Sequence, residues 1–327
     1  MKRLKAIVIV LICIGLQSSL FAGDKVAQSK MQFLKIGVGA RAAGMGDAFT
    51  AVGKDPNSIF FNPAAPALSN GLNLTLNSTQ WIADINHLSG VISYTWEDVG
   101  TFTLDYINVD YGPMQRTIVD PHGWESYQTL GEFTVKEYAI GLGFAKELSE
   151  QFSVGGQVKY IYQNLGDTET WWYIGTEFEE HKDVSNIDDA IAFDLGTYYD
   201  TQYKGLKIGM AIQNFANKAI PLTFRFGLSF ELNQVLFPEN NDHIIMLAWD
   251  ALHPKDYGER QHFGLEYSFR GTYYLRTGYK FNYDNEDISA GLGVNVDVNA
   301  LRVSFEYAYS NFSLFGNVNR FTVSLKF

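Results

Sequence analysis

From Gly71 to the C-terminus, apolar and polar residues alternate with a period of two in one segment after another. The last segment places Phe321, Val323, Leu325 and Phe327 on one face, and Arg320, Thr322, Ser324 and Lys326 on the other. This is the pattern of β-strands with one apolar and one polar face. Each segment has about ten residues, the length that a tilted strand needs to cross a bilayer. A soluble sandwich alternates as well, but its buried face seldom needs so much Phe and Tyr in every segment.

Roughly fourteen such segments follow one another, an even number of the kind found in bacterial membrane barrels. They begin near Leu72, Leu88, Thr101, Val135, Phe152, Ile187, Leu206, Leu222, Ile244, Gln261, Tyr273, Ile288, Leu301 and Val318. The segment at Ile244 is short and continuously apolar, so it departs from the alternation of the others. The sequence predicts an all-β fold, a transmembrane antiparallel β-barrel of about 14 strands over residues 71–327.

The connections between the segments alternate in length. One side carries short turns near residues 97–100, 146–150, 200–204, 270–271 and 297–299, with a longer link at 233–242. The other side carries two long stretches, 110–130 and 165–186, and shorter ones near 78–86, 254–259 and 310–317. Bacterial outer-membrane barrels have short periplasmic turns and longer extracellular loops. We therefore expect an outer-membrane location, with the short turns and both termini in the periplasm.

The first 22 residues predict a signal peptide. Lys2 and Arg3 precede an apolar run, Leu4 to Leu16, which is short for a transmembrane helix and has the layout of a secretory signal. We place its cleavage near Ala22. The only cysteine, Cys13, lies in this run, so we expect no thiol or disulfide in the mature chain. A formal net charge of −11 without basic clusters argues against nucleic-acid binding.

Residues 23–70 differ from the rest because Gly and Ala dominate from Gln32 to Leu68. Small residues let a backbone pack closely against another surface, and Gly tolerates positive φ. Such a segment suits a compact piece in a narrow space, although composition alone fits an ordinary Gly-rich loop equally well. The order of residues is more specific: it runs Gly39, Arg41, Gly44, Gly46, Asp47, and then Asn62, Pro63 and Ala64.

This order resembles the N-terminal segment of the PorV/PorQ family, relatives of the FadL-type outer-membrane proteins. The resemblance is close from Gln32 to Leu68 and extends to the remainder only in architecture. It implies that residues 23–70 form a hatch, a segment folded inside the barrel as a plug. Ala65 and Pro66 stand where the family usually has Gly after Asn-Pro-Ala, so the resemblance does not extend to the turn that leaves the plug.

Charges of both signs fall on the polar faces of the predicted strands, which fits a lumen filled by a hatch and water. We expect Arg41 to contact a lumen carboxylate; the alternative is that its side chain extends to the periplasm. The bulky apolar residues of the hatch either line a path for an apolar solute or anchor the plug to the wall. They are Met45, Phe49, Phe60 and Phe61.

Gly112 and Pro113 follow the third predicted strand. Proline removes a donor from the strand ladder, and glycine allows the chain to bend. FadL-type proteins open laterally at their third strand. The resemblance therefore implies a lateral exit at this kink, which would release an apolar solute into the membrane.

Aromatic residues concentrate in the two long connections, as Trp124, Trp171, Trp172 and Tyr173. Exposed aromatic clusters mark binding surfaces, but these residues fit equally well an aromatic girdle on strands that run past the membrane. The alternating last strand ends on Phe327, which resembles the signal read by outer-membrane assembly machinery.

No residue pattern predicts an enzyme, a metal site or a cofactor. Gly37 and Gly39 lack the preceding strand and the following acidic residue of a nucleotide-binding loop. The chain has no Gly-x-Ser-x-Gly elbow, and its six histidines are scattered, most of them in predicted connections. Because a catalytic triad can assemble from distant positions, the absence of a motif lowers the chance of an enzyme without excluding it.

Two classes of function compete. Resemblance to FadL implies a passive channel for hydrophobic small molecules, with the hatch as gate. Resemblance to PorV implies a non-transporting component of the type IX secretion system that receives exported proteins at the cell surface. The expected partners are outer-membrane lipid, the assembly machinery, and either a hydrophobic ligand or type IX secretion components.

Overall fold

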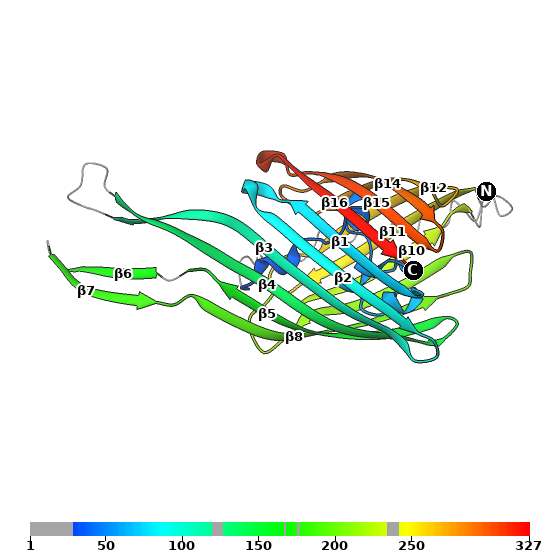
Figure 1. Cartoon of the computed structure of the whole chain (residues 1–327), viewed down its shortest axis with the longest axis horizontal. Helices are drawn as coiled ribbons and strands as arrows, with labels where there is room; N and C mark the ends of the chain where they lie inside the picture. Colours follow the sequence, from blue (N-terminus) through cyan, green and yellow to red (C-terminus); the bar gives the residue numbers. More distant parts are fainter. Residues whose placement is uncertain (1–28, 120–126, 167, 175–176, 234–241) are drawn as a thin grey trace.

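The computed structural model describes residues 29–119, 127–166, 168–174, 177–233 and 242–327. Within these residues, fourteen antiparallel strands close into a barrel in which each strand pairs with its neighbours along the chain. The first and last barrel strands pair with each other, for example at Leu74 and Leu325, so the barrel has no open edge between them. Figure 1 shows the strongly tilted strands around a lumen that contains the blue N-terminal segment.

The barrel strands begin where the alternating pattern predicts them. They are β1 (Leu72–Gln80), β2 (Asn86–Trp96), β3 (Gly100–Val119), β4 (Tyr127–Ser149), β5 (Phe152–Asn164), β8 (Ile187–Asp200), β9 (Leu206–Phe215), β10 (Thr223–Glu231), β11 (His243–Pro254), β12 (Arg260–Phe269), β13 (Tyr273–Phe281), β14 (Ile288–Val298), β15 (Leu301–Asn311) and β16 (Asn317–Lys326). The prediction of a 14-strand antiparallel barrel is confirmed, including the apolar segment that forms β11.

Apolar side chains lie on the outer face of the barrel and polar ones on the inner face. In β16, Phe321 and Val323 are exposed on the outside, whereas Arg320 and Thr322 are buried inside. Tyr138 on β4 lies against tyrosines of β3 and β5, and together they form an aromatic cluster on the outer face of these three strands. In membrane barrels, aromatic residues gather at the interface between the membrane and water.

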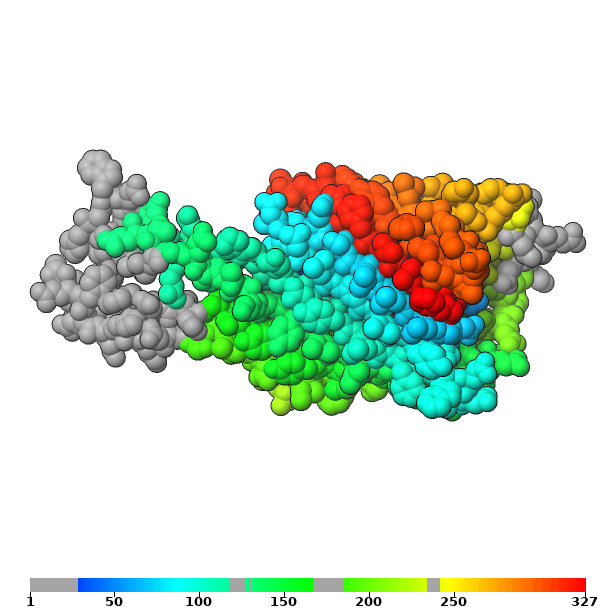
Figure 2. Space-filling view, viewed as in Figure 1, coloured from blue at the N-terminus to red at the C-terminus, as the bar shows by residue number. Residues whose placement is uncertain are grey.

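The two ends of the barrel differ. At the short-turn end, β2–β3, β4–β5, β8–β9, β12–β13 and β14–β15 join through brief turns. At the opposite, long-hairpin end, β3 and β4 continue far beyond the rim, and β6 (Thr168–Ile174) pairs with β7 (Glu177–Val184) in a separate two-stranded sheet. The stretches predicted as long loops are therefore largely strand, because their polar residues still pair as ribbons. Figures 1 and 2 show these ribbons extending away from the barrel.

The N-terminal segment lies inside the barrel and contains only short helical turns. They are η1 (Gln32–Lys35), α2 (Ala40–Gly44), η2 (Pro56–Phe60) and η3 (Ala65–Leu68). Two further turns, η4 (Ile82–Asp84) and η5 (Ser313–Phe315), lie in connections at the long-hairpin end. Among the described residues, no helix is long and apolar enough to cross a membrane. Residues 29–71 are called the hatch below.

The hatch enters from the long-hairpin end. The backbone N–H of Lys30 donates to the carbonyl oxygen of Ala219 in the β9–β10 connection, at 2.8 Å. Lys35 pairs with Asp256 in the β11–β12 connection, at 2.6 Å. Phe327 lies at the other end, where its N–H donates to the carbonyl oxygen of Leu72. The predicted signal peptide, residues 1–22, and the start of the predicted hatch lie outside the described residues, so the position of the N-terminus itself stays a prediction.

The orientation of the β4 side chains predicts a depth-dependent cost of charge. Leu142→Arg places a cation on the outer face, midway along the part of β4 that pairs with β5. We expect it to lower the free energy of unfolding in a bilayer by about 2–4 kcal/mol. Leu148→Arg, at the short-turn end of the same strand, serves as the control and should cost about 0–1 kcal/mol. Urea unfolding of the protein from lipid vesicles measures both. Equal costs would contradict the placement of Leu142 in the hydrocarbon layer.

Candidate functional site: the lumen and its hatch

The hatch backbone rests directly on glycines of the barrel wall. Three of the contacts use glycines that face each other on neighbouring strands, namely Gly155 with Gly196, Gly209 with Gly227, and Gly264 with Gly278. A methyl group at Gly155 would collide with the carbonyl oxygen of Pro63, and one at Gly278 with the backbone nitrogen of Gly46. The wall therefore has no space for a side chain where the hatch touches it.

Glycines of the hatch meet this wall from the inside. The Cβ of any residue at Gly44 would lie 3.1 Å from the Cα of Gly291 on β14. Gly46 has a φ of 63° and faces the backbone of Tyr279. Gly39 has a φ of 89° and packs on the side chain of Asn57. The Gly-rich sequence thus reflects close backbone contact and left-handed backbone conformations.

Asn62 joins two parts of the hatch to the wall. Its amide nitrogen donates to the carbonyl oxygens of Thr50 in the hatch and Thr197 on β8, both at 2.9 Å. Its side-chain oxygen accepts from the N–H of Ala64 at 3.0 Å. Asn62 and Ala64 are fully buried. Ala65 and Pro66, which depart from the family pattern, begin the turn η3.

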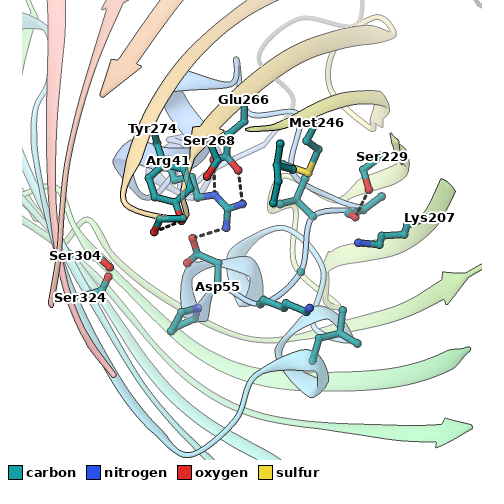
Figure 3. A pocket seen from close by; sticks show the side chains of 18 of the residues that line it. Arg41, Asp55, Lys207, Ser229, Met246, Glu266, Ser268, Tyr274, Ser304 and Ser324 are labelled. Carbon is teal, nitrogen blue, oxygen red and sulfur yellow. Dashed lines mark hydrogen bonds and ion pairs between the residues drawn. The ribbon is translucent and has the colours of Figure 1, made fainter. Parts of the chain in front are cut away.

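Arg41 contacts a lumen carboxylate, as the sequence predicted. Its guanidinium donates two hydrogen bonds of 2.8 Å to Glu266 on β12 and reaches Asp55 of the hatch at 3.4 Å (Figure 3). Glu266 also accepts from Arg276 on β13 at 2.7 Å, and Arg276 donates to Glu306 on β15 at 2.9 Å. These charges alternate in sign and fix one face of the hatch to three strands.

A second buried pair holds the middle of the hatch. Asp250 on β11 accepts hydrogen bonds of 3.0 Å from the backbone nitrogens of Phe49 and Thr50, and one of 2.6 Å from the Thr50 hydroxyl. Arg225 on β10 donates to the same carboxylate at 3.0 Å. The role of Asp250 as a hatch contact was not predicted from the sequence. Its position as the single charge in an apolar run is the signal that could have indicated it.

Asp47, one of the hatch residues singled out in the sequence, has a left-handed backbone with a φ of 58°. Its carboxylate pairs with Lys280 on β13 at 2.7 Å. Burial alone would raise the pKa of the Asp47 carboxyl, but the cations of Lys280 and Arg320 outweigh burial and hold that pKa below its usual range. Asp47 therefore carries a negative charge inside the lumen.

Below the hatch, a cavity of about 480 Å³ opens towards the short-turn end. Charged and hydroxyl side chains line it, as Figure 3 shows for Arg41, Asp55, Lys207, Ser304 and Ser324, together with apolar side chains such as Met246. The lining of this chamber is therefore mixed, with many charged groups. The hatch separates it from the other half of the lumen.

On the other side of the hatch, the inner wall carries an apolar patch. Ile107 on β3, Ala139 on β4 and Ile161 on β5 point inward and are buried. Met31 and Phe33 of the hatch pack against them. This patch was not predicted from the sequence, because the inner faces of the strands were expected to be polar throughout.

A cavity of about 90 Å³ adjoins this patch, between the hatch and the wall. Phe60, Phe61 and Ile107 contribute apolar surface, and Lys159 and Arg225 contribute charge. The cavity is therefore amphipathic rather than purely apolar.

Met45 and Phe49 do not line this cavity. Both are completely buried in the hatch, and Phe49 packs edge-on against Phe61 with ring centroids 5.3 Å apart. They contact Met246 and Ala248 of β11 within the same apolar cluster. Their position favours the anchoring role over a path.

The kink at Gly112 and Pro113 is a β-bulge in the β3–β4 ladder, and Gly112 has a φ of 68°. It lies beyond the last β2–β3 pair, which joins Asn86 and Asp110. Below that pair the β2–β3 ladder continues without interruption to Trp96 and Gly100. In this structure the kink lies at the rim of a closed wall, so an exit there stays a proposal that requires opening.

The structure describes only part of the aromatic residues predicted for the two long connections. Trp124 lies outside the described residues, and Trp171, Trp172 and Tyr173 belong to β6, of which only the backbone is described. Their role stays a prediction. Phe327 is exposed beside β1, and its role as an assembly signal also stays a prediction.

No protein-family model and no curated protein sequence matches this chain. Solved structures match its fold. The toluene transporter TbuX of Ralstonia pickettii has a TM-score of 0.58 and 13% identity, over 88% of this chain and 97% of that one. A FadL homologue of Pseudomonas aeruginosa has a TM-score of 0.55 and 11% identity, over 89% of this chain and 98% of that one. The toluene transporter TodX of Pseudomonas putida has a TM-score of 0.57 and 11% identity, over 88% of this chain and 96% of that one.

The chain therefore has the FadL-like fold, a closed barrel of fourteen strands with a short N-terminal segment inside. At these identities the similarity concerns the fold alone.

The glycine contacts predict a sharp difference between two adjacent residues of β5. Gly155→Ala should loosen the hatch at a cost of about 1–3 kcal/mol, because its methyl group would collide with the Pro63 carbonyl. Gly156→Ala is the control, because its methyl group lies at an ordinary 3.5 Å from Leu195 on the outer face. Conductance in planar bilayers reports loosening as frequent openings in the Gly155 variant. Two equally silent variants would contradict the tight fit.

The Arg41 network predicts strong coupling between its members. Glu266→Gln should destabilise the protein by about 3–5 kcal/mol, because it leaves two buried guanidinium groups without their shared carboxylate. Arg41→Met combined with Glu266→Met should cost less than the sum of the two single changes. Urea unfolding of the wild type, the two single Met variants and the double Met variant measures the coupling. Additive losses of unfolding free energy would show that the two side chains act independently.

Proposed function

We propose that this protein is an outer-membrane channel for hydrophobic small molecules, with the hatch as its gate. The observation that carries the proposal is the apolar patch on the inner wall. Ile107 and Ile161 point into a lumen whose other inward positions are mostly polar, and they share one apolar cluster with Met31 and Phe33 of the hatch. A lumen that held nothing but water would gain no advantage from inward isoleucines, whereas an apolar solute needs such a surface.

The geometry supports a route that begins at the long-hairpin end. A solute would replace Met31 and Phe33 on the apolar patch and then reach the cavity beside Phe60 and Phe61. Further passage requires the hatch to move, because its backbone touches the wall at the glycine contacts. The TbuX and TodX structures, described as toluene transporters, show that proteins of this fold carry such solutes.

The cellular placement belongs to the same proposal. Residues 1–22 would direct export, the short turns would lie in the periplasm, and the long hairpins would lie outside the cell. The tyrosine cluster on β3, β4 and β5 and the exposed apolar face would supply the contact with membrane lipid. Phe327 would be read by the assembly machinery.

The long hairpins favour a second candidate. β3, β4 and the β6–β7 sheet extend well beyond the barrel rim (Figure 1). A pure channel needs no such surface, whereas a type IX secretion component of the PorV/PorQ kind would use it to receive exported proteins. This role rests on the resemblance of the hatch sequence, and in it the apolar patch would serve only to hold Met31 and Phe33 of the hatch.

Filling the apolar patch tests the channel. Ile107→Trp places a large ring beside the cavity and should reduce the uptake of radiolabelled toluene by cells that lack other hydrophobic channels. Leu104→Trp on the same strand is the control, because Leu104 faces outward and is 46% exposed. Toluene uptake should fall for the Ile107→Trp variant and stay unchanged for the Leu104→Trp variant. A wild-type protein that adds no toluene uptake would contradict the channel and favour the docking role.

A further inference from the structure

The outer face of the barrel carries an apolar groove of about 650 Å³ that crosses β2, β3, β4, β5 and β8. Volumes of about 300–1,000 Å³ are typical of sites that hold a small molecule. Four residues that lie opposite one another in the strand register mark its length, one each on β3, β4, β5 and β8: Phe102, Phe144, Gly156 and Leu195. We call this depression the outer groove.

Gly156 creates the depression. A side chain at this position would point outward, because its methyl group would lie 3.5 Å from the side chain of Leu195. On one flank Phe144 packs against Phe102, with ring centroids 5.0 Å apart, and on the other flank Leu195 is exposed. A glycine between large apolar side chains therefore leaves a gap in the outer surface.

The outer groove lies in the part of the wall that faces hydrocarbon. Leu104, Leu142 and Phe193 continue its lining on the next row of outward residues, and all three are exposed apolar side chains. The core of a bilayer contains no water that could fill such a groove. An unfilled gap would also lose the van der Waals contacts of its walls. A hydrocarbon chain is therefore the occupant that the position and the lining favour.

Charged groups of both signs lie at the short-turn end of the outer groove. Lys146 follows Phe144 by two residues on the same face of β4, so its backbone lies about 7 Å nearer that end. Its Nζ donates to the carbonyl oxygen of Asp98 in the β2–β3 turn at 3.2 Å. Glu97 and Asp98 in this turn are exposed, and so is the adjoining Trp96. A cation, two carboxylates and a tryptophan thus lie together at the end of the strands, where membrane barrels have an aromatic interface.

These charges fit a zwitterionic head group. A phosphate accepts hydrogen bonds from a lysine ammonium group, and a second ammonium group pairs with carboxylates. A head group with a phosphate and no cation would bring its negative charge next to Glu97 and Asp98 without compensation. Ethanolamine phospholipids carry both charges on neighbouring groups, together with the acyl chains that an apolar groove requires.

We propose that the outer groove binds an ethanolamine phospholipid of the membrane. One acyl chain lies over Gly156, the phosphate lies at Lys146, and the ammonium group lies at Glu97 and Asp98. This inference goes beyond the proposed channel function, because it concerns the outer face and does not depend on which solute crosses the lumen. It depends on the membrane placement of the barrel, which the channel and the docking role share.

Native mass spectrometry of the purified protein tests the site. Phosphatidylethanolamine added in detergent should bind to the wild type at a single site. Gly156→Trp should weaken this binding by about tenfold, because the ring would fill the floor of the groove. Leu292→Trp is the matched control: it adds the same ring at an exposed outward position on β14 and should bind the lipid like the wild type. Both variants should migrate as folded barrels in electrophoresis without heating.

The head-group contacts are tested without a change in the wall. The wild type should bind phosphatidylethanolamine more tightly than phosphatidylglycerol, and Glu97→Gln combined with Asp98→Asn should remove this preference. Asn suits the left-handed φ of 63° at Asp98, so the turn is retained. Lys146→Gln should weaken the binding of both lipids by about threefold, as expected for the loss of an exposed ion pair.

Equal binding of the two lipids by the wild type would overturn the inference. Equal binding of phosphatidylethanolamine by the Gly156→Trp and Leu292→Trp variants would overturn it as well, because the groove would then be ordinary lipid contact. A lipid-free dimer of the wild type that Gly156→Trp converts to a monomer would assign the groove to a second copy of the chain instead. If the Gly156→Trp variant does not fold, the head-group variants decide alone.

Discussion

Contact between the hatch backbone and the barrel wall is the constraint on which the rest of this structure depends. Glycines on at least six strands allow the hatch to lie against the wall without an intervening side chain, and glycines of the hatch complete the contact from within. Such a fit leaves no continuous space past the hatch. It also divides the lumen into two chambers of different chemistry, because each chamber is lined by what the hatch and the wall expose on that side.

Buried charge fixes the orientation of the hatch within this fit. Glu266 binds both Arg41 and Arg276, and Asp250 binds two backbone nitrogens of the hatch together with Arg225. Buried ions are tolerated only where their partners are well placed, so these contacts specify one arrangement rather than simply adding stability. Both networks lie deep in the barrel. The hatch entrance is held by a backbone bond and an exposed ion pair of Lys30, by the Lys35–Asp256 pair and by the packing of Met31 and Phe33.

The sequence alone determined the barrel. Strict alternation over segments of bilayer length leaves one fold in which every backbone group is paired and one face is apolar, namely a closed antiparallel barrel. Even β11, whose segment at Ile244 is short and continuously apolar, was located. The hatch was predictable from the order of its residues and the family resemblance that this order carries, because its Gly- and Ala-rich composition alone fits an ordinary loop equally well. The contact of Arg41 with a carboxylate was predictable in kind, because a buried guanidinium needs an anion.

Only the tertiary structure decided which residues meet. Glu266 and Asp250 are 225 and 201 residues from their hatch partners in the sequence. The wall glycines are also far from theirs, and closure of the barrel sets the register of all of them. The apolar patch around Ile107 and the separation of Phe49 from the cavity depend on where the hatch rests along the barrel axis. The outer groove over Gly156 is invisible in an alternating sequence, because alternation records which face a side chain takes and not which residues lie opposite it on the neighbouring strands. The sequence thus specified the wall, and three-dimensional packing decided what lies against it on either face.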